Sequence, residues 1–166
     1  MNDRQALFFR QASSDWRMFQ WLRSRVNRRL CEVCHALHYL QMAVEKLSKS
    51  YFLRAGPIRH SHKYFSKFWR ALLTANRVRR ALGYGNSEAY RNRLLLAEGL
   101  AARIEELAPD LAGQGPNTEY PWPEPDYQHA PAGFHFPIWG RIDHGQDGAI
   151  LLEIVDRLFA AAPNSF

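Results

Sequence analysis

The most regular hydrophobic pattern of the chain lies between residues 30 and 53. Its apolar residues recur at alternating steps of four and three, which places them on one face of a helix. They are Val33, Leu37, Leu40, Val44, Leu47 and Tyr51. No glycine or proline interrupts the pattern before Gly56 and Pro57, which end it. We therefore predict one helix from about residue 27 or 29 to residue 53, and we expect it to be the central helix of a bundle.

The opposite face of this helix is rich in polar and sulfur-containing side chains. It carries Cys31, His35, His38, Met42, Glu45, Lys46 and Lys49. A helix face in contact with water usually carries a plainer set of Glu, Lys, Gln and Ala. We therefore expect this face to meet a second neighbour, from the same chain or from another copy. Four of its residues are assigned to buried polar or interfacial positions: His35, His38, Glu45 and Lys46.

Helical spacing of apolar residues predicts four further helices. They cover residues 3–26, 61–82, 87–107 and 148–161. The first contains Ser13, Ser14 and Asp15, which are common N-cap residues, but we expect a single helix that is at most bent there. Trp69 lies off both stripes of the helix predicted over residues 61–82, and packing is its expected role.

Residues 108–147 differ from the rest of the chain in composition. Seven of the nine prolines lie between residues 109 and 137, interleaved with tyrosine, tryptophan and phenylalanine. Disordered linkers are poor in aromatic residues, so we expect an ordered loop packed on the bundle. The alternation of Phe134, Phe136 and Ile138 permits a short extended piece. The predicted fold is thus all-α, a single domain over residues 1–166, built as an up-and-down antiparallel bundle of about five helices.

Length and apolar content limit the class of protein. The 166 residues fit one domain with a sizeable core. There is no apolar run of about 18 residues, and the N-terminus does not resemble a signal peptide. We therefore expect no membrane span, a cytoplasmic location and two reduced cysteines.

The net charge of +6 hides a strong asymmetry between the two halves of the chain. Residues 1–81 hold 17 lysines and arginines against 4 acidic residues, and residues 82–166 hold 5 against 12. The stretch between Glu45 and Glu88 has no acidic residue but ten lysines and arginines. This pattern indicates an anionic partner, either nucleic acid, nucleotide or an acidic protein surface. The alternative is that the acidic half docks on the basic half and neutralises it.

Four cations form a ridge if residues 61–82 are helical, because they recur at i, i+4, i+7 and i+14. They are Lys63, Lys67, Arg70 and Arg77. Contact with phosphates and simple solvation are both open interpretations of this ridge.

The cysteines and histidines allow two metal or cofactor interpretations. Cys31, Cys34 and His35 match the CxxCH pattern of covalent haem attachment, but that chemistry belongs to exported proteins. Cys31, His35 and His38 have a spacing suited to zinc, yet a structural site would need further ligands such as His60 and His62. We therefore expect neither a metal nor a cofactor, and assign the histidines to helix–helix or dimer contacts.

His60 and His62 follow Arg54 and Arg59 where the basic segment enters its helix. A histidine with a pKa near 6.5 beside arginines is suited to moving a proton at an RNA 2′-hydroxyl while a guanidinium holds the phosphate. In this hypothesis Arg54 holds the phosphate and His60, or with less support His62, is the general acid and base. A capping or turn histidine is the alternative.

Residues 35–68 resemble the HEPN family of bacterial and archaeal helical domains. The resemblance is carried by a helix with a characteristic polar set, a glycine-containing turn, and a histidine at the next helix, His60 or His62. The polar set is His38, Gln41, Glu45, Lys46 and Lys49, and residues 11–16 are similar to the first helix of the family.

The resemblance implies an antiparallel helical bundle that is often dimeric. Many members look like metal-independent endoribonucleases with an Arg-x(4–6)-His motif; others bind nucleotides, act as scaffolds, or pair with a nucleotidyltransferase in toxin–antitoxin systems. Arg54 and His60 have the spacing of that motif, as do Arg29 and His35. The leading hypothesis is a homodimer that binds RNA or nucleotide through its basic face, residues 46–80, and cleavage of the RNA is left open. The alternative is a non-enzymatic interaction module that docks an acidic partner.

Overall fold

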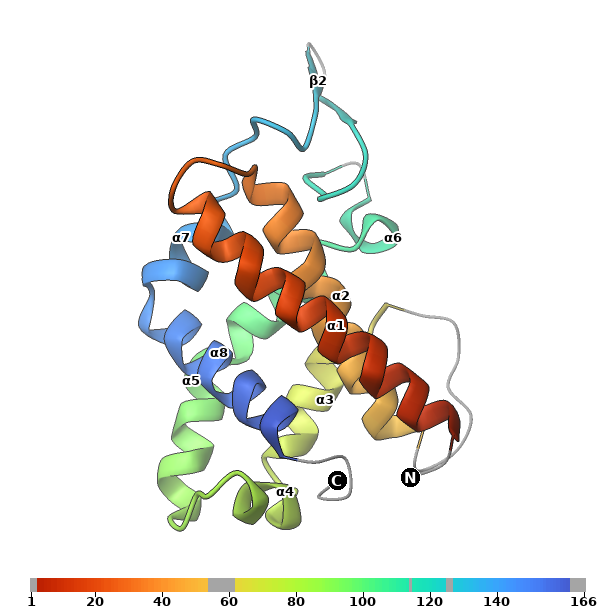
Figure 1. Ribbon diagram of the computed structural model, residues 1–166. Helices are drawn as coiled ribbons and strands as arrows, with labels where there is room; N and C mark the ends of the chain where they lie inside the picture. Colours follow the sequence, from red (N-terminus) through yellow and green to blue (C-terminus); the bar gives the residue numbers. More distant parts are fainter. Residues whose placement is uncertain (1–2, 54–61, 114, 125–126, 162–166) are drawn as a thin grey trace.

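The computed structural model describes residues 3–53, 62–113, 115–124 and 127–161, and the predicted all-α class is confirmed. These ranges contain eight helices and one two-stranded antiparallel sheet (Figure 1). The elements are α1 (Asp3–Val26), α2 (Val33–Phe52), α3 (Phe65–Leu72), α4 (Asn76–Ala81), α5 (Ser87–Glu105), α6 (Pro109–Ala112), β1 (Trp122–Glu124), β2 (Tyr127–His129), α7 (Pro137–His144) and α8 (Gln146–Ala160). No helix in the described ranges combines the length and the apolar character needed to cross a membrane.

The helix α1 runs without interruption from Asp3 to Val26, as predicted. The serine in its middle does not cap a new helix, because Ser13 Oγ donates to the carbonyl of Phe9 one turn earlier, at 2.8 Å. Asp15 is also unavailable as a cap, since it is buried against Lys46 of α2. The Asp15–Lys46 ion pair and the packing of the two helices hold α1 and α2 together as a helical hairpin (Figure 1).

The predicted central helix is confirmed as α2, which packs against α1, α3 and α5. The middle of its apolar stripe is buried, with Leu37, Leu40 and Leu47 inaccessible to solvent, while Val33 and Tyr51 at its ends are half-buried. The helix begins at Val33, later than expected, because the chain turns back beforehand and Arg29 takes a left-handed φ of 58°. Cys31 therefore precedes the helix, and the predicted helical spacing of Cys31 and His35 is wrong.

The single helix predicted over residues 61–82 is also wrong. α3 ends at Leu72, Ala75 leaves the helical region with a ψ of 71°, and α4 begins at Asn76. In one straight helix Val78 would lie about 120° around the axis from Leu72. The break lets both side chains enter the core, where they are 3% and 0% exposed.

The segment before the last helix contains α6, the β1–β2 hairpin and α7, so more elements are present than the five helices expected. The strands pair Trp122 with His129 and Glu124 with Tyr127, and the hairpin projects away from the helices (Figure 1). The extended piece predicted around residues 134–138 is not a strand, since Ile138 lies in α7. Trp122 and Phe136 are buried in the same core as the central helix.

The last helix, predicted over residues 148–161, spans Gln146–Ala160 and packs against α5 and α7. It also meets the inner face of α1, where Phe159 stacks on Trp16 with ring centroids 5.4 Å apart. The backbone of α7 approaches Gly148 so closely that an added Cβ would lie 2.1 Å from the carbonyl oxygen of Arg141. Only glycine fits this crossing, because the obstructing atoms belong to backbone.

We expect Gly148→Ala to lower the free energy of unfolding by about 2 kcal/mol or more, since overpacking against backbone forces α7 and α8 apart. Gly99→Ala is the matched control, because Gly99 lies within α5 with no atom within 4 Å of its added Cβ. That substitution should stabilise the protein by roughly 0.5–1 kcal/mol through helix propensity. Urea denaturation measures both; equal effects of the two alanines would contradict the close crossing.

Candidate functional site

A buried carboxylate forms the centre of the polar side of α2. Glu45 is 5% exposed and accepts hydrogen bonds from three side chains. Gln41 Nε2 and His62 Nδ1 contact Glu45 Oε2 at 2.8 and 2.7 Å, and Lys49 Nζ contacts Glu45 Oε1. The expected second neighbour of this helix face therefore belongs to the same chain, at the residue that leads into α3.

The pKa of Glu45 is lowered despite the burial of its carboxyl group. Burial alone raises the pKa, because it disfavours the charged form. The hydrogen bonds from Lys49 and His62, the positive charge of Lys49 and the amide of Gln41 together outweigh that effect. The folded protein consequently holds Glu45 as a carboxylate.

His62 is held between two carboxylates. Its Nδ1 contacts Glu45, and its Nε2 lies 3.2 Å from Oδ2 of Asp110 in α6. A general base needs a ring nitrogen that is open to the substrate, whereas both nitrogens of His62 already face acids. This geometry favours a role in fastening residue 62 to α2 and α6 over the catalytic role considered above.

The other proposed catalytic residues, Arg54 and His60, lie outside the described residues. Of the proposed triplet, the described geometry therefore places only His62.

Lys46 lies on the flank of α2 that faces α1. Its Nζ is 2.5 Å from Oδ2 of Asp15, and Gln11 Nε2 donates to Oδ1 of the same carboxylate at 2.9 Å. The ion pair is nearly buried, since the Asp15 side chain is 7% exposed. Lys46 therefore joins the two helices of the hairpin and is not free to bind a ligand.

The two remaining residues assigned to buried or interfacial positions differ from each other. His38 is half-buried, and its Nδ1 lies 3.3 Å from Glu119 Oε1 without the alignment of a hydrogen bond. His35 is exposed, so a buried role for it is wrong. It lines a groove of about 760 Å³ beside the turn between α1 and α2, together with Leu30 and Cys31.

Both cysteines are free, and burial raises the pKa of each thiol. Cys34 is buried in the core, while Cys31 is half-buried in the turn before α2. Neither environment favours a thiolate. Within the described ranges, no three His, Cys, Asp or Glu side chains form a cluster that could hold a metal ion.

The predicted basic ridge is divided by the break between α3 and α4. Lys63, Lys67 and Arg70 are exposed along or just before α3, whereas Arg77 belongs to α4. Arg70 Nε contacts Glu98 Oε1 of α5 at 2.6 Å, and Lys67 Nζ lies 5.0 Å from the centre of the Phe52 ring. The ridge is therefore shorter than predicted and partly neutralised.

A larger set of cations without acidic partners lies on and beside α1. The set comprises Arg4, Arg10, Arg17, Arg28 and Arg29. All five are exposed, and their side chains form no hydrogen bond or ion pair with another described residue. This set was not predicted from the sequence, although its signal was present: residues 3–29 contain seven arginines and only two acids.

Exposed apolar side chains accompany these arginines. Leu7, Met18 and Trp21 are 57%, 39% and 51% exposed, and Leu30 in the following turn is 71% exposed. Arg25 lies flat on Trp21, with its guanidinium carbon 3.5 Å from the ring centre. We call one helical stripe the outer face of α1, consisting of Leu7, Arg10, Ser14, Arg17, Met18, Trp21 and Arg25.

A groove of about 550 Å³ follows the first half of this face, between α1 and Lys46 of α2. The second groove, which His35 lines, begins at Trp21. The outer face thus combines positive charge, exposed apolar groups and concave borders along one helix.

Comparison with models of protein families, with curated proteins and with solved structures finds no match to this chain.

We expect Glu45→Gln to lower the free energy of unfolding at pH 7 by on the order of 3 kcal/mol, because it leaves Lys49 and His62 without their anion. The lowered pKa of Glu45 also determines how the free energy of unfolding depends on pH. In the wild type, the stabilisation by ionised Glu45 is complete above its unfolded-state pKa of about 4.3. It is lost as pH falls through the lower folded-state pKa.

Urea titrations between pH 3 and pH 7 should thus show that the free energy of unfolding of Glu45→Gln falls less steeply toward acid pH than that of the wild type. Glu124→Gln is the control, since Glu124 is 59% exposed and its pair with His129 should contribute less than about 1 kcal/mol. Parallel pH profiles for the wild type and Glu45→Gln would contradict the buried carboxylate.

Proposed function

We propose that this chain is a HEPN-like helical domain that acts as a non-enzymatic interaction module. Its outer face of α1 docks an acidic, amphipathic helical segment of a partner protein. The observation that carries this proposal is the row of arginines without acidic partners, interleaved with exposed Leu7, Met18 and Trp21.

The spacing on α1 supports a helical partner. Leu7, Ser14 and Trp21 are seven residues apart, and Met18 and Arg25 stand four residues after the second and third of them. This is the repeat by which one helix receives another along a shallow seam. Arg10 and Arg17 flank the seam, where they would meet acidic residues on the edges of the incoming helix.

The apolar residues favour a protein over RNA. Leu7 and Met18 would contribute little binding free energy to a contact with phosphates, because phosphates are bound through charge and hydrogen bonds. Tryptophan, arginine and methionine are the residues enriched at the centres of protein interfaces. The cations on this helix are all arginines, which suit bidentate pairing with carboxylates.

Charge also argues against a second copy of the chain on the same face. A symmetric contact would bring Arg10 and Arg17 of one copy near those of the other. The outer face has no acidic residue to compensate, and like charges brought together at an interface cost several kcal/mol. The homodimer implied by the family resemblance, if it forms, would use another surface.

Photo-crosslinking tests this proposal. A photoreactive amino acid replaces Met18, at the centre of the outer face, and in a control protein it replaces Leu96, which is exposed on α5. After irradiation in the native cells, mass spectrometry identifies the crosslinked segment. We expect the Met18 probe to capture an acidic, helix-forming peptide, and Arg10→Glu with Arg17→Glu to reduce its yield about tenfold or more. Arg91→Glu, an exposed arginine of α5, is the charge control.

The alternatives give different products. RNA attached to the Met18 probe would replace the proposal by RNA binding, as would a high 260/280 absorbance ratio that falls in salt. A second copy of the chain would indicate self-association. A yield no greater than that of the Leu96 probe would refute docking on this face.

RNA cleavage is a separate proposal, supported by the spacing of Arg54 and His60 and by the surrounding arginines and lysines. Its test incubates structured RNA in EDTA with the wild type, Arg54→Ala and His60→Ala, and analyses the ends for 2′,3′-cyclic phosphate. Loss of cleavage in both variants would support it; equal activity in all three proteins, or none in any, removes it. Because both ring nitrogens of His62 face carboxylates, we expect His62→Gln to lower stability while any cleavage persists.

A further inference from the structure

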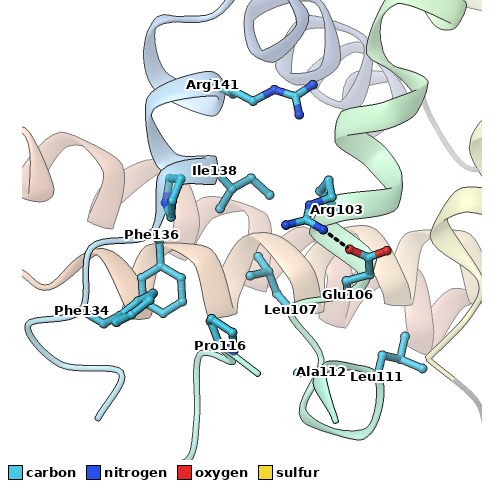
Figure 2. A pocket seen from close by; sticks show the side chains of 11 residues that line it. Arg103, Glu106, Leu107, Leu111, Ala112, Pro116, Phe134, Phe136, Ile138 and Arg141 are labelled. Atoms are coloured by element: carbon cyan, nitrogen blue, oxygen red, sulfur yellow. Dashed lines mark hydrogen bonds and ion pairs between the residues drawn. The ribbon is translucent and has the colours of Figure 1, made fainter. Parts of the chain in front are cut away.

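A cavity of about 400 Å³ lies between the end of α5, α6 and the start of α7 (Figure 2). Its volume falls in the range that holds small organic ligands. The apolar residues that line it include Leu107, Leu111, Pro116, Phe134, Phe136 and Ile138. Most of them come from residues 108–147, the loop rich in proline and aromatic residues, which thereby closes one side of the cavity.

The aromatic side of this cavity is well ordered by packing. Phe134 and Phe136 meet edge to face, with ring centroids 4.9 Å apart and planes at 79°. Phe136 and Leu107 are 2% and 6% exposed, so they are fixed parts of the core. Such a surface can cover a flat apolar ring without rearranging.

Two guanidinium groups stand away from the phenylalanine rings, one from α5 and one from α7 (Figure 2). Arg103 Nη1 donates to Glu106 Oε2 at 2.9 Å, but the two side chains are 67% and 55% exposed, so this pair is weak. Arg141 uses Nε and Nη2 to bind Asp147 Oδ2, at 3.0 and 2.5 Å. Nε and Nη2 of Arg103 and Nη1 of Arg141 have no hydrogen-bond partner among the described residues and remain available as donors.

We propose that this cavity binds a small aromatic carboxylate. The ring lies against Phe134 and Ile138, which line the cavity and are only half-buried, and the carboxylate accepts hydrogen bonds from Arg103 and Arg141. Arginine donors match the two oxygens of a carboxylate, and the apolar surface excludes a bare inorganic anion. This site shares no lining residue with the outer face of α1, and its test does not depend on the function proposed for that face.

Isothermal titration of the purified chain with 2-naphthoate tests the proposal. The matched ligand is 2-naphthalenemethanol, which has the same ring system and no charge. We expect saturable binding of one naphthoate per chain, at least about tenfold tighter than the alcohol, as a charge-assisted hydrogen bond provides. Absence of saturable naphthoate binding, or equal binding of the two ligands, would overturn the proposal.

Two substitutions on one exposed ion pair sharpen this test. Arg103→Gln should weaken naphthoate about tenfold and leave the alcohol unchanged, since it removes only a donor. Glu106→Gln should instead strengthen naphthoate binding, because it removes the carboxylate that competes for Arg103. Arg91→Gln, away from the cavity, is the control. Circular dichroism verifies folding; unchanged naphthoate affinity in Arg103→Gln would refute the assignment of the anion site.

Discussion

The structure depends on the buried carboxylate of Glu45, which stays ionised in the folded protein. α2 is enclosed by α1, α3 and α5, so the polar groups on its far side must find partners within the chain. Glu45 meets this requirement by binding Lys49 and Gln41 of its own helix and His62 from the segment beyond it. The carboxylate thereby determines where the chain returns to the bundle to begin α3. Asp15 and Lys46 have the corresponding role between α1 and α2.

Part of the acidic half of the chain neutralises part of the basic half, which was the alternative to an anionic partner for the basic segment. Ion pairs that cross between the halves include Arg23 with Asp143 at 2.8 Å and Arg70 with Glu98 at 2.6 Å. Lys46 and Lys49 form ion pairs with the buried acids Asp15 and Glu45. Among the described cations of residues 1–81, six arginines that pair with no acid lie on or beside α1: Arg4, Arg10, Arg17, Arg25, Arg28 and Arg29. The surface that they form differs from the segment with the highest cation density in the sequence.

The long helices could be predicted from the sequence because each carries several turns of periodic apolar residues, as in α2, and because stretches such as Gly83–Gly85 punctuate them. The break before Asn76 could not, since no glycine or proline marks it and its cause is the burial of Val78 in the core. Ion pairing could not be predicted for the same kind of reason. Whether Arg70 or Arg17 pairs with an acid depends on acids distant in sequence, which the spacing of residues along one helix does not reveal.

The outer face of α1 is not explained by the fold. The inner face of this helix already buries Ala12, Trp16, Phe19 and Leu22, which secures it to α2 and α8. An exposed face that served stability alone would carry acid–base pairs one turn apart and few apolar groups. Here the arginines lack such pairs, and Leu7 and Trp21 remain in water, where they gain nothing from folding. Because the chain forgoes stabilisation on this face, the composition of the face supports the proposed contact with another molecule.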